Sequence, residues 1–156
     1  MKKTNAARIL DSLDISYEIK EYPVDLDDLS AVNVAAKVGM DVKMVFKTLV
    51  ARGDKNGVLM ACIPGDGELD LKALAAASGN KRVEMVHLKE VLGLTGYVRG
   101  GCSPLGAKKE YPVFLDKSAE QWTTIAISAG MRGEQILLAP QDLVRAVKAE
   151  MVEISR

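Results

Sequence analysis

Two β-rich runs joined by a tight turn constrain the fold of this chain more than any other feature of its sequence. The runs span residues 45–51 and 58–63, and the turn between them contains Asn56 and Gly57. An Asn-Gly pair readily adopts the positive φ angles of a tight hairpin turn, so the runs predict an antiparallel hairpin. The second run is apolar at every position, which is typical of a strand covered on both faces. We therefore expect this strand at the centre of a sheet.

Other patterns surround this hairpin with helices and further strands. Apolar spacing and capping residues predict helices over residues 4–13, 30–38, 71–77, 88–92 and 141–149. Alternating or β-branched runs predict strands over residues 15–22, 83–86, 95–99, 112–116, 123–128 and 135–138, the last two as a second hairpin. We expect a mixed α/β (α+β) fold in a single domain over residues 1–156.

The composition indicates a soluble protein without a strong overall charge. The chain has 21 Lys and Arg residues against 21 Asp and Glu residues, so its net charge is zero. A neutral chain has no global attraction to nucleic acid, and we expect no DNA partner. No apolar run approaches the roughly 18 residues of a membrane span, and the N-terminus lacks the apolar segment of a secretory signal. We expect a cytoplasmic protein that does not associate with membranes.

Cysteine and histidine are too scarce for several kinds of active site. The chain has two cysteines, Cys62 and Cys102, and one histidine, His87. These cannot form a disulfide framework or a four-ligand zinc site, so we expect neither a metal nor a cofactor. A Ser-His-Asp or Cys-His mechanism would need His87 in every role.

The segment 100–106, Gly-Gly-Cys-Ser-Pro-Leu-Gly, is the leading candidate for a ligand-binding loop. Its two adjacent glycines allow close approach of the backbone to a ligand, and the Ser-Pro pair restricts the backbone that follows. Many glycine-rich loops are only turns, and that alternative stays open at this point.

Three side chains could carry chemistry in or near such a loop. Lys47 lies in the first run of the hairpin, where a lysine either faces solvent or presents a cation to a cleft. Cys102 would act as a nucleophile only beside a base or in a positive environment, and His87 is the one histidine available. Ser128 ends a predicted strand, where its hydroxyl either points into a cleft or caps a turn.

Taken in order, several segments resemble the signatures of the YbaK/EbsC family. This family contains free-standing deacylases of mischarged transfer RNA, which are related to the editing insertion of bacterial prolyl-tRNA synthetases. The segments are residues 45–49 (VFKTL), 67–72 (GELDLK), 81–85 (KRVEM), 95–97 (TGY), 100–109 (GGCSPLGAKK) and 127–130 (ISAG). The resemblance implies a mixed, partly barrel-like β-sheet with surrounding helices.

The resemblance also implies an activity and a partner. Members of the family remove a wrongly attached cysteine or alanine from the 3′ end of tRNA(Pro), so aminoacylated tRNA is the expected substrate. Prolyl-tRNA synthetase is a candidate partner, and the oligomeric state stays open between a monomer and a weak dimer. In cysteine-specific members the substrate's own thiol attacks the ester carbonyl. Because a tRNA ester is already activated, positioning and backbone N–H groups can suffice without a metal or triad.

The same resemblance implies the roles of individual residues. Lys47 matches the essential lysine, expected near the terminal adenosine. Gly100 and Gly101 match the catalytic loop, whose backbone contacts the aminoacyl group. The residues expected to bind substrate, either within this loop or at the margins of the pocket, are Tyr22, Cys102, Ser103, Pro104, Ser128 and Gly130.

Three departures from the family pattern leave the choice of substrate open. The aromatic residue expected in the acidic linker is missing near Leu29 and Ser30, Ala129 stands where the family has glycine, and Gln135 stands where an acidic residue is common. Each change can alter the size or polarity of the pocket. The alternatives are a deacylase for alanine or another small amino acid, and a catalytically silent module that binds tRNA or a synthetase.

Overall fold

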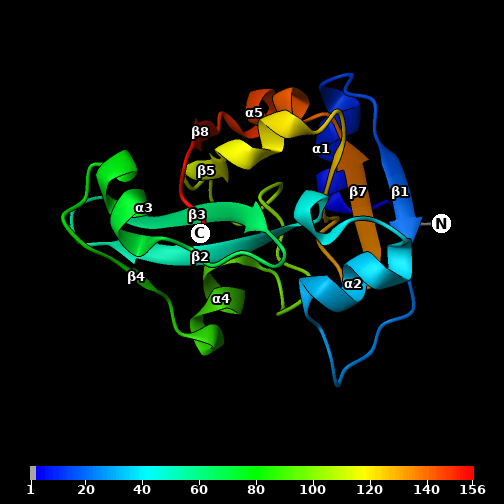
Figure 1. The fold of residues 1–156 in the computed structure, drawn as a ribbon, viewed down its shortest axis with the longest axis horizontal. Coiled ribbons are helices and arrows are strands. Elements are labelled where there is room, and N and C mark those ends of the chain that lie inside the picture. Colours follow the sequence, from blue (N-terminus) through cyan, green and yellow to red (C-terminus); the bar gives the residue numbers. More distant parts are fainter. Residues whose placement is uncertain (1–2) are drawn as a thin grey trace.

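The computed structural model describes residues 3–156, which form two β-sheets with helices packed around them (Figure 1). Met1 and Lys2, which belong to the expected domain, lie outside the described residues. The helices are α1 (Asn5–Ser12), α2 (Ala31–Val38), α3 (Leu71–Ser78), α4 (Leu88–Thr95) and α5 (Pro140–Val147), with 3₁₀ turns η1 (Val42–Met44) and η2 (Lys117–Gln121). The strands are β1 (Glu18–Glu21), β2 (Phe46–Gly53), β3 (Gly57–Pro64), β4 (Val83–Met85), β5 (Val113–Asp116), β6 (Ile125–Ser128), β7 (Glu134–Leu138) and β8 (Glu150–Val152).

The predicted central hairpin forms the middle of a five-stranded sheet. β2 pairs antiparallel with β3, and the order of strands is β4-β2-β3-β5-β8. β5 and β8 join in parallel, so the sheet is mixed. Along β3, Met60 and Cys62 belong to one core cluster whereas Leu59 and Ile63 belong to another. Apolar groups on both faces of β3 therefore have cover, which confirms the central position expected from its sequence.

A smaller three-stranded sheet contains the second predicted hairpin. Its order is β1-β7-β6, and both pairings are antiparallel. A parallel bridge between Val45 and Ala126 connects the start of β2 to β6, so the two sheets meet at one edge. The strands curve around a shared core without closing into a barrel.

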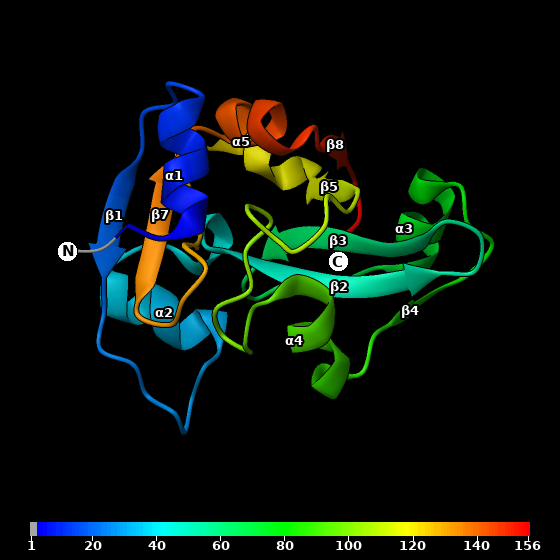
Figure 2. The ribbon, with the colours of Figure 1, turned by 180° about the vertical axis from the view of Figure 1, so that it is seen from behind.

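The helices surround the two sheets, and each forms where the sequence predicts one, although α4 and α5 end at other residues than expected. α3 and α4 lie beside the five-stranded sheet, whereas α1 and α2 lie beside the three-stranded sheet (Figures 1 and 2). The Ser30 hydroxyl accepts a hydrogen bond from the Asn33 amide at the start of α2, and Gly39 ends that helix at φ 70°. Asp70 caps α3 in the same way through the Ala73 amide.

One expectation about secondary structure is wrong, and one strand was missed. The predicted strand over residues 95–99 does not form, because α4 continues through Gly93 to Thr95 and ends at Gly96, where φ is 84°. The Thr95 hydroxyl donates to the Val91 carbonyl and accepts from the Tyr97 amide, which stabilises this helix end. Strand β8 was not predicted, and its pairing with β5 depends on contacts far apart in the sequence. The wrong prediction at residues 95–99 came from Thr95 and Val98, because β-branched residues are common in strands.

No helix within residues 3–156 is both long and apolar enough to cross a membrane. The same residues contain no group of three or more His, Cys, Asp or Glu side chains arranged to hold a metal ion.

Candidate active site

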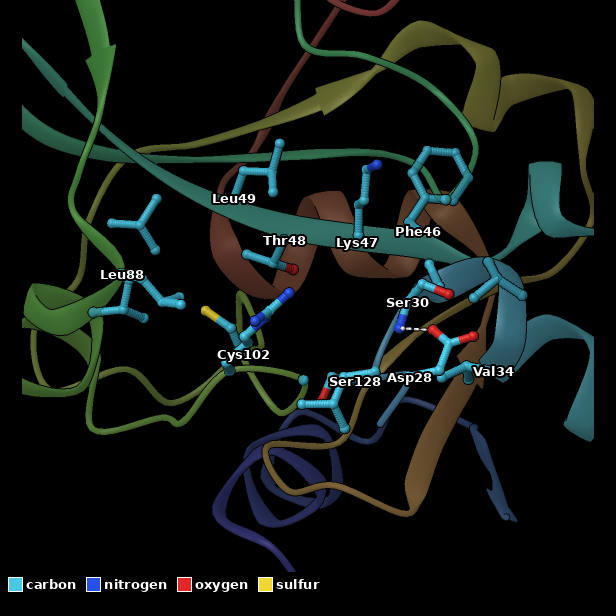
Figure 3. A pocket seen from close by; sticks show the side chains of 18 of the residues that line it. Asp28, Ser30, Val34, Phe46, Lys47, Thr48, Leu49, Leu88, Cys102 and Ser128 are labelled. Carbon is cyan, nitrogen blue, oxygen red and sulfur yellow. Dashed lines mark hydrogen bonds between the residues drawn. The ribbon is translucent and has the colours of Figure 1, made fainter. Parts of the chain in front are cut away.

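A cavity of about 490 Å³ lies where the two sheets meet. Strand β2 forms one wall, and the segment before α2 forms another (Figure 3). The remaining walls come from α4, the glycine loop and the β6–β7 hairpin. The polar and charged residues of the lining are Asp27, Asp28, Ser30, Lys47, Thr48, Arg99, Cys102, Ser128 and Gln135.

Strand β2 places consecutive side chains on opposite sides. Lys47 and Leu49 extend from one side of the strand, whereas Thr48 extends from the other side toward Cys102 (Figure 3). The Thr48 hydroxyl lies 3.6 Å from the Cys62 sulfur, within hydrogen-bonding distance for a thiol. Thr48 is a lining residue that sequence reasoning overlooked. Because successive side chains in a strand point to opposite sides, the sequence could have shown that Thr48 and Lys47 face opposite ways.

The glycine loop has no regular secondary structure, and its two glycines serve different purposes. Gly100 adopts φ 85°, which strongly favours glycine, and it lines the cavity. Gly101 does not line the cavity in the described structure, and its amide donates to the Val98 carbonyl at 2.9 Å. A Cβ at Gly101 would lie 3.2 Å from the Cα of Met131, so this glycine lets the loop pack against the β6–β7 turn. Within residues 3–156, no backbone carbonyl accepts from the amides of Gly100 or Cys102.

Side-chain contacts hold the loop in place. The Tyr97 hydroxyl donates to the Leu105 carbonyl, and its ring lies against Gly130 in the β6–β7 turn. Burial raises the pKa of Tyr97 to about 12, so the hydroxyl keeps the proton that it donates. The buried Ser103 hydroxyl accepts from the Leu105 amide, and Arg132 donates to the Arg99 carbonyl at 2.7 Å. The loop is therefore positioned by its neighbours rather than by a helix or sheet.

Both cysteines keep their protons near neutral pH. Burial raises the pKa of the Cys102 thiol to about 11, although a hydrogen bond with Thr95 opposes the rise. Burial raises the pKa of Cys62 to about 12. A protonated thiol is a poor nucleophile, so the surroundings of Cys102 do not provide the activation that covalent catalysis needs.

Charged side chains of both signs also line the cavity. The Ser30 amide donates to the Asp28 carboxylate at 3.0 Å (Figure 3), and hydrogen bonds from Ser30 hold the pKa of Asp28 below its usual range. Asp28 therefore remains an anion near neutral pH. Lys47 and Arg99 contribute cations to the same lining, so the cavity offers charges of both signs.

The structure brings some of the predicted site residues together and leaves others apart. Lys47, Gly100, Cys102 and Ser128 line the cavity, whereas Tyr22, Gly101, Ser103, Pro104 and Gly130 do not within the described residues. Two of the residues that do not line the cavity make hydrogen bonds near it. The Gly130 amide donates to the Ser128 hydroxyl, and the Tyr22 amide donates to the Gly133 carbonyl. Pro104 lines a second cavity of about 450 Å³ on the far side of the loop.

Comparison with known proteins identifies the family. Residues 28–146 match the family model of the aminoacyl-tRNA editing domain. The chain is 47% identical to EbsC of Enterococcus faecalis (strain ATCC 700802 / V583) over 99% of this chain and 94% of that protein. The chain belongs to the aminoacyl-tRNA editing domain family. The matched residues include every residue that lines the main cavity except Asp27.

One further relative and one solved structure also resemble this chain. EbsC is named for a proposed activity, Cys-tRNA(Pro)/Cys-tRNA(Cys) deacylase. A multifunctional Ser/Thr-tRNA deacylase of Escherichia coli (strain K12), ProXp-y, is 31% identical over 70% of this chain and 68% of its own. A crystal structure described as a proposed trans-editing enzyme for prolyl tRNA synthetase has a TM-score of 0.84. That structure covers 100% of this chain and 99% of its own at 23% identity, which shows a shared fold.

Proposed function

We propose that this protein is a trans-editing aminoacyl-tRNA deacylase that removes mischarged cysteine from tRNA(Pro). The observation that carries the proposal is a cavity whose glycine-loop wall includes Gly100 and Cys102, whose backbone N–H groups donate to no backbone carbonyl within residues 3–156. The kinship with EbsC over nearly the whole chain supports the same reaction.

The loop acts by stabilising charge that develops during the reaction. Backbone N–H groups aimed at a developing oxyanion lower the barrier without a metal or a charged catalyst. Of the two predicted catalytic glycines, Gly100 contributes its amide directly, whereas Gly101 holds the loop against the neighbouring turn. Lys47 supplies a cation for the phosphate or ribose of the terminal adenosine.

The nucleophile comes from the substrate rather than from the protein. The thiol of the bound cysteinyl group attacks its own ester carbonyl, so a sulfur–carbon bond forms and the ester carbon–oxygen bond breaks. The thiol proton ends on the departing ribose oxygen, and water later opens the cyclic thioester. The protonated state of Cys102 is consistent with this division of labour, because its thiol does not compete for the carbonyl.

The partner is the 3′ end of the aminoacylated tRNA, which enters the cavity between β2 and the glycine loop, with Lys47 on the other side of β2 from Thr48. The neutral net charge provides little general attraction to tRNA, so we propose that prolyl-tRNA synthetase supplies part of the affinity. Adding the synthetase to the deacylation assay should then lower the KM for tRNA with little change in kcat.

Deacylation of Cys-tRNA(Pro) and Ala-tRNA(Pro), followed in parallel with buffer, tests the proposal. We expect faster loss of the cysteinyl ester with the protein than without it. Equal rates with protein and buffer for both substrates would overturn the proposal. Salt-sensitive retention of tRNA without turnover would instead support a silent binding module.

A further inference from the structure

The cavity contains a buried hydrogen-bonding group that the described part of the chain leaves without a partner. Gln135 on β7 lines the cavity, and only 5% of its surface is exposed. Within residues 3–156, no group hydrogen-bonds to its side-chain oxygen, Oε1. Ser118 Oγ is the other such buried atom in the described structure, and it does not line the cavity. A buried acceptor without a hydrogen-bond partner costs free energy unless a ligand donates to it. Gln135 therefore indicates that the ligand carries a hydrogen-bond donor.

Neighbouring strands place Gln135 beside a second neutral polar group. Gln135 lies opposite Ser128 on β6, and both residues line the cavity. On its other side it lies opposite Lys20 on β1, whose ammonium is 3.3 Å from the Val38 carbonyl and donates there. The β6–β7 end of the cavity therefore offers an amide and a hydroxyl.

The two ends of the cavity suit different parts of an aminoacyl group. The α-ammonium carries a positive charge and is best matched by an anion, which Asp28 supplies from the wall before α2. A primary amide is neutral, and it can accept through its oxygen or donate through its nitrogen. That combination matches a hydroxyl or thiol, which can also donate and accept.

We infer that Gln135 is a specificity-determining residue that recognises a hydroxyl or thiol on the β carbon of the aminoacyl group. This inference rests on the proposed deacylase function and names its substrate class: cysteinyl, seryl and threonyl esters rather than alanyl esters. A substrate without such a group leaves the buried amide unpaired, and that loss opposes its binding in the transition state.

The sharpest test compares esters of equal size. Cysteine, serine and 2-aminobutyrate differ mainly in whether the β carbon bears a thiol, a hydroxyl or a methyl group. We expect the wild-type protein to deacylate Ser-tRNA(Pro) at least about tenfold faster in kcat/KM than 2-aminobutyryl-tRNA(Pro), which is the scale of one buried hydrogen bond. Serine is preferred to cysteine for this comparison because its hydroxyl does not cyclise. Water is then the nucleophile for both the seryl and the 2-aminobutyryl ester, so the two rates differ through recognition of the β substituent alone.

The variant Gln135→Met removes the amide while keeping a side chain of similar length. We expect it to close the gap between the seryl and 2-aminobutyryl esters, by lowering the first and leaving the second nearly unchanged. Gln135→Glu keeps an acceptor and should retain most of the gap. Gln141→Met is the matched control, because Gln141 is exposed on α5 and does not line the cavity.

The outcomes separate this inference from the proposed function. If the wild type accelerates no ester, the proposed function fails and the inference fails with it. If it accelerates esters but treats seryl and 2-aminobutyryl groups alike, only the inference fails, and this result needs no variant to fold. A uniform loss on all esters in a folded Gln135→Met protein would also overturn it, since a merely structural role predicts that pattern.

Discussion

The two walls that face each other across the cavity are built in opposite ways. The β2 wall is a regular strand, with eight residues paired to β3 and the first part of its length exposed to the cavity. The glycine-loop wall has no regular hydrogen-bonding pattern and is held by single contacts from Tyr97, Ser103 and Arg132. One wall is rigid because its own backbone is paired, whereas the other is rigid only because its neighbours hold it.

This difference predicts how each wall responds to mutation. Side chains on β2 can be changed while the strand persists, so their loss should affect activity more than stability. Changes to the groups that fix the loop backbone should alter both, because the backbone amides lose their placement when such a contact is removed. The Cys102 side chain is not one of these groups, so its removal should alter neither. Four substitutions test this contrast.

Replacing Lys47 by alanine should have the largest effect on activity. We expect kcat/KM for Cys-tRNA(Pro) to fall at least tenfold, which corresponds to about 1.4 kcal/mol of transition-state stabilisation. The thermal midpoint should change little, because Lys47 has no ion pair within residues 3–156 and is only partly buried. Lys55→Ala, in the exposed β2–β3 turn, is the control and should keep full activity. Full activity in Lys47→Ala would show that the lysine has no role in binding or catalysis.

Replacing Gly100 by alanine should disturb the loop wall itself. A side chain at φ 85° costs about 1–3 kcal/mol, and its Cβ would also contact Leu29. We expect lower stability in urea together with a severalfold loss of activity. Gly93→Ala is the control, since Gly93 lies within α4 with open space around it, and this change should stabilise by about 0.5–1 kcal/mol. An unchanged Gly100→Ala protein would contradict the described loop conformation.

Replacing Tyr97 by phenylalanine should loosen the loop by removing one hydrogen bond. We expect a loss of about 0.5–1.5 kcal/mol in stability and a smaller, severalfold fall in kcat with little change in KM. Tyr111→Phe removes a similar bond to the Leu94 carbonyl away from the main cavity. That control should lose similar stability and keep its activity. Equal kinetic effects of the two variants would show that Tyr97 acts only on stability.

Replacing Cys102 by alanine should have the smallest effect. Because the raised pKa of about 11 keeps this thiol protonated between pH 6 and 9, its removal should change the rate less than about twofold. The pH profiles of variant and wild type should be parallel over that interval. A thiolate mechanism instead predicts a rate that rises with pH toward the pKa and vanishes in the variant, so that result would restore Cys102 as the nucleophile.

Local signals in the sequence predicted the β2 wall well and the loop wall only in outline. The Asn56-Gly57 turn, the apolar run of β3 and the caps at Ser30 and Asp70 each depend on neighbours within a few residues, and the structure confirms them. Residues 95–99 misled because β-branched side chains occur in helix ends as well as strands. The β6–β7 hairpin was expected, but its packing against the glycine loop was not.

The sequence by itself determined the element order, the central hairpin and, through its resemblance to a family, which residues to suspect. Only the tertiary structure decided that Thr48 rather than Lys47 extends toward Cys102, and that Gly101 supports the loop instead of lining the cavity. It also decided that the side-chain oxygen of Gln135 has no hydrogen-bond partner within residues 3–156. The physical reason is the range of the interactions involved. Turns and caps depend on residues within a few positions of each other. The cavity depends instead on segments that are far apart in the sequence and pack together, and this packing decides where only glycine fits and which buried polar groups lack a partner.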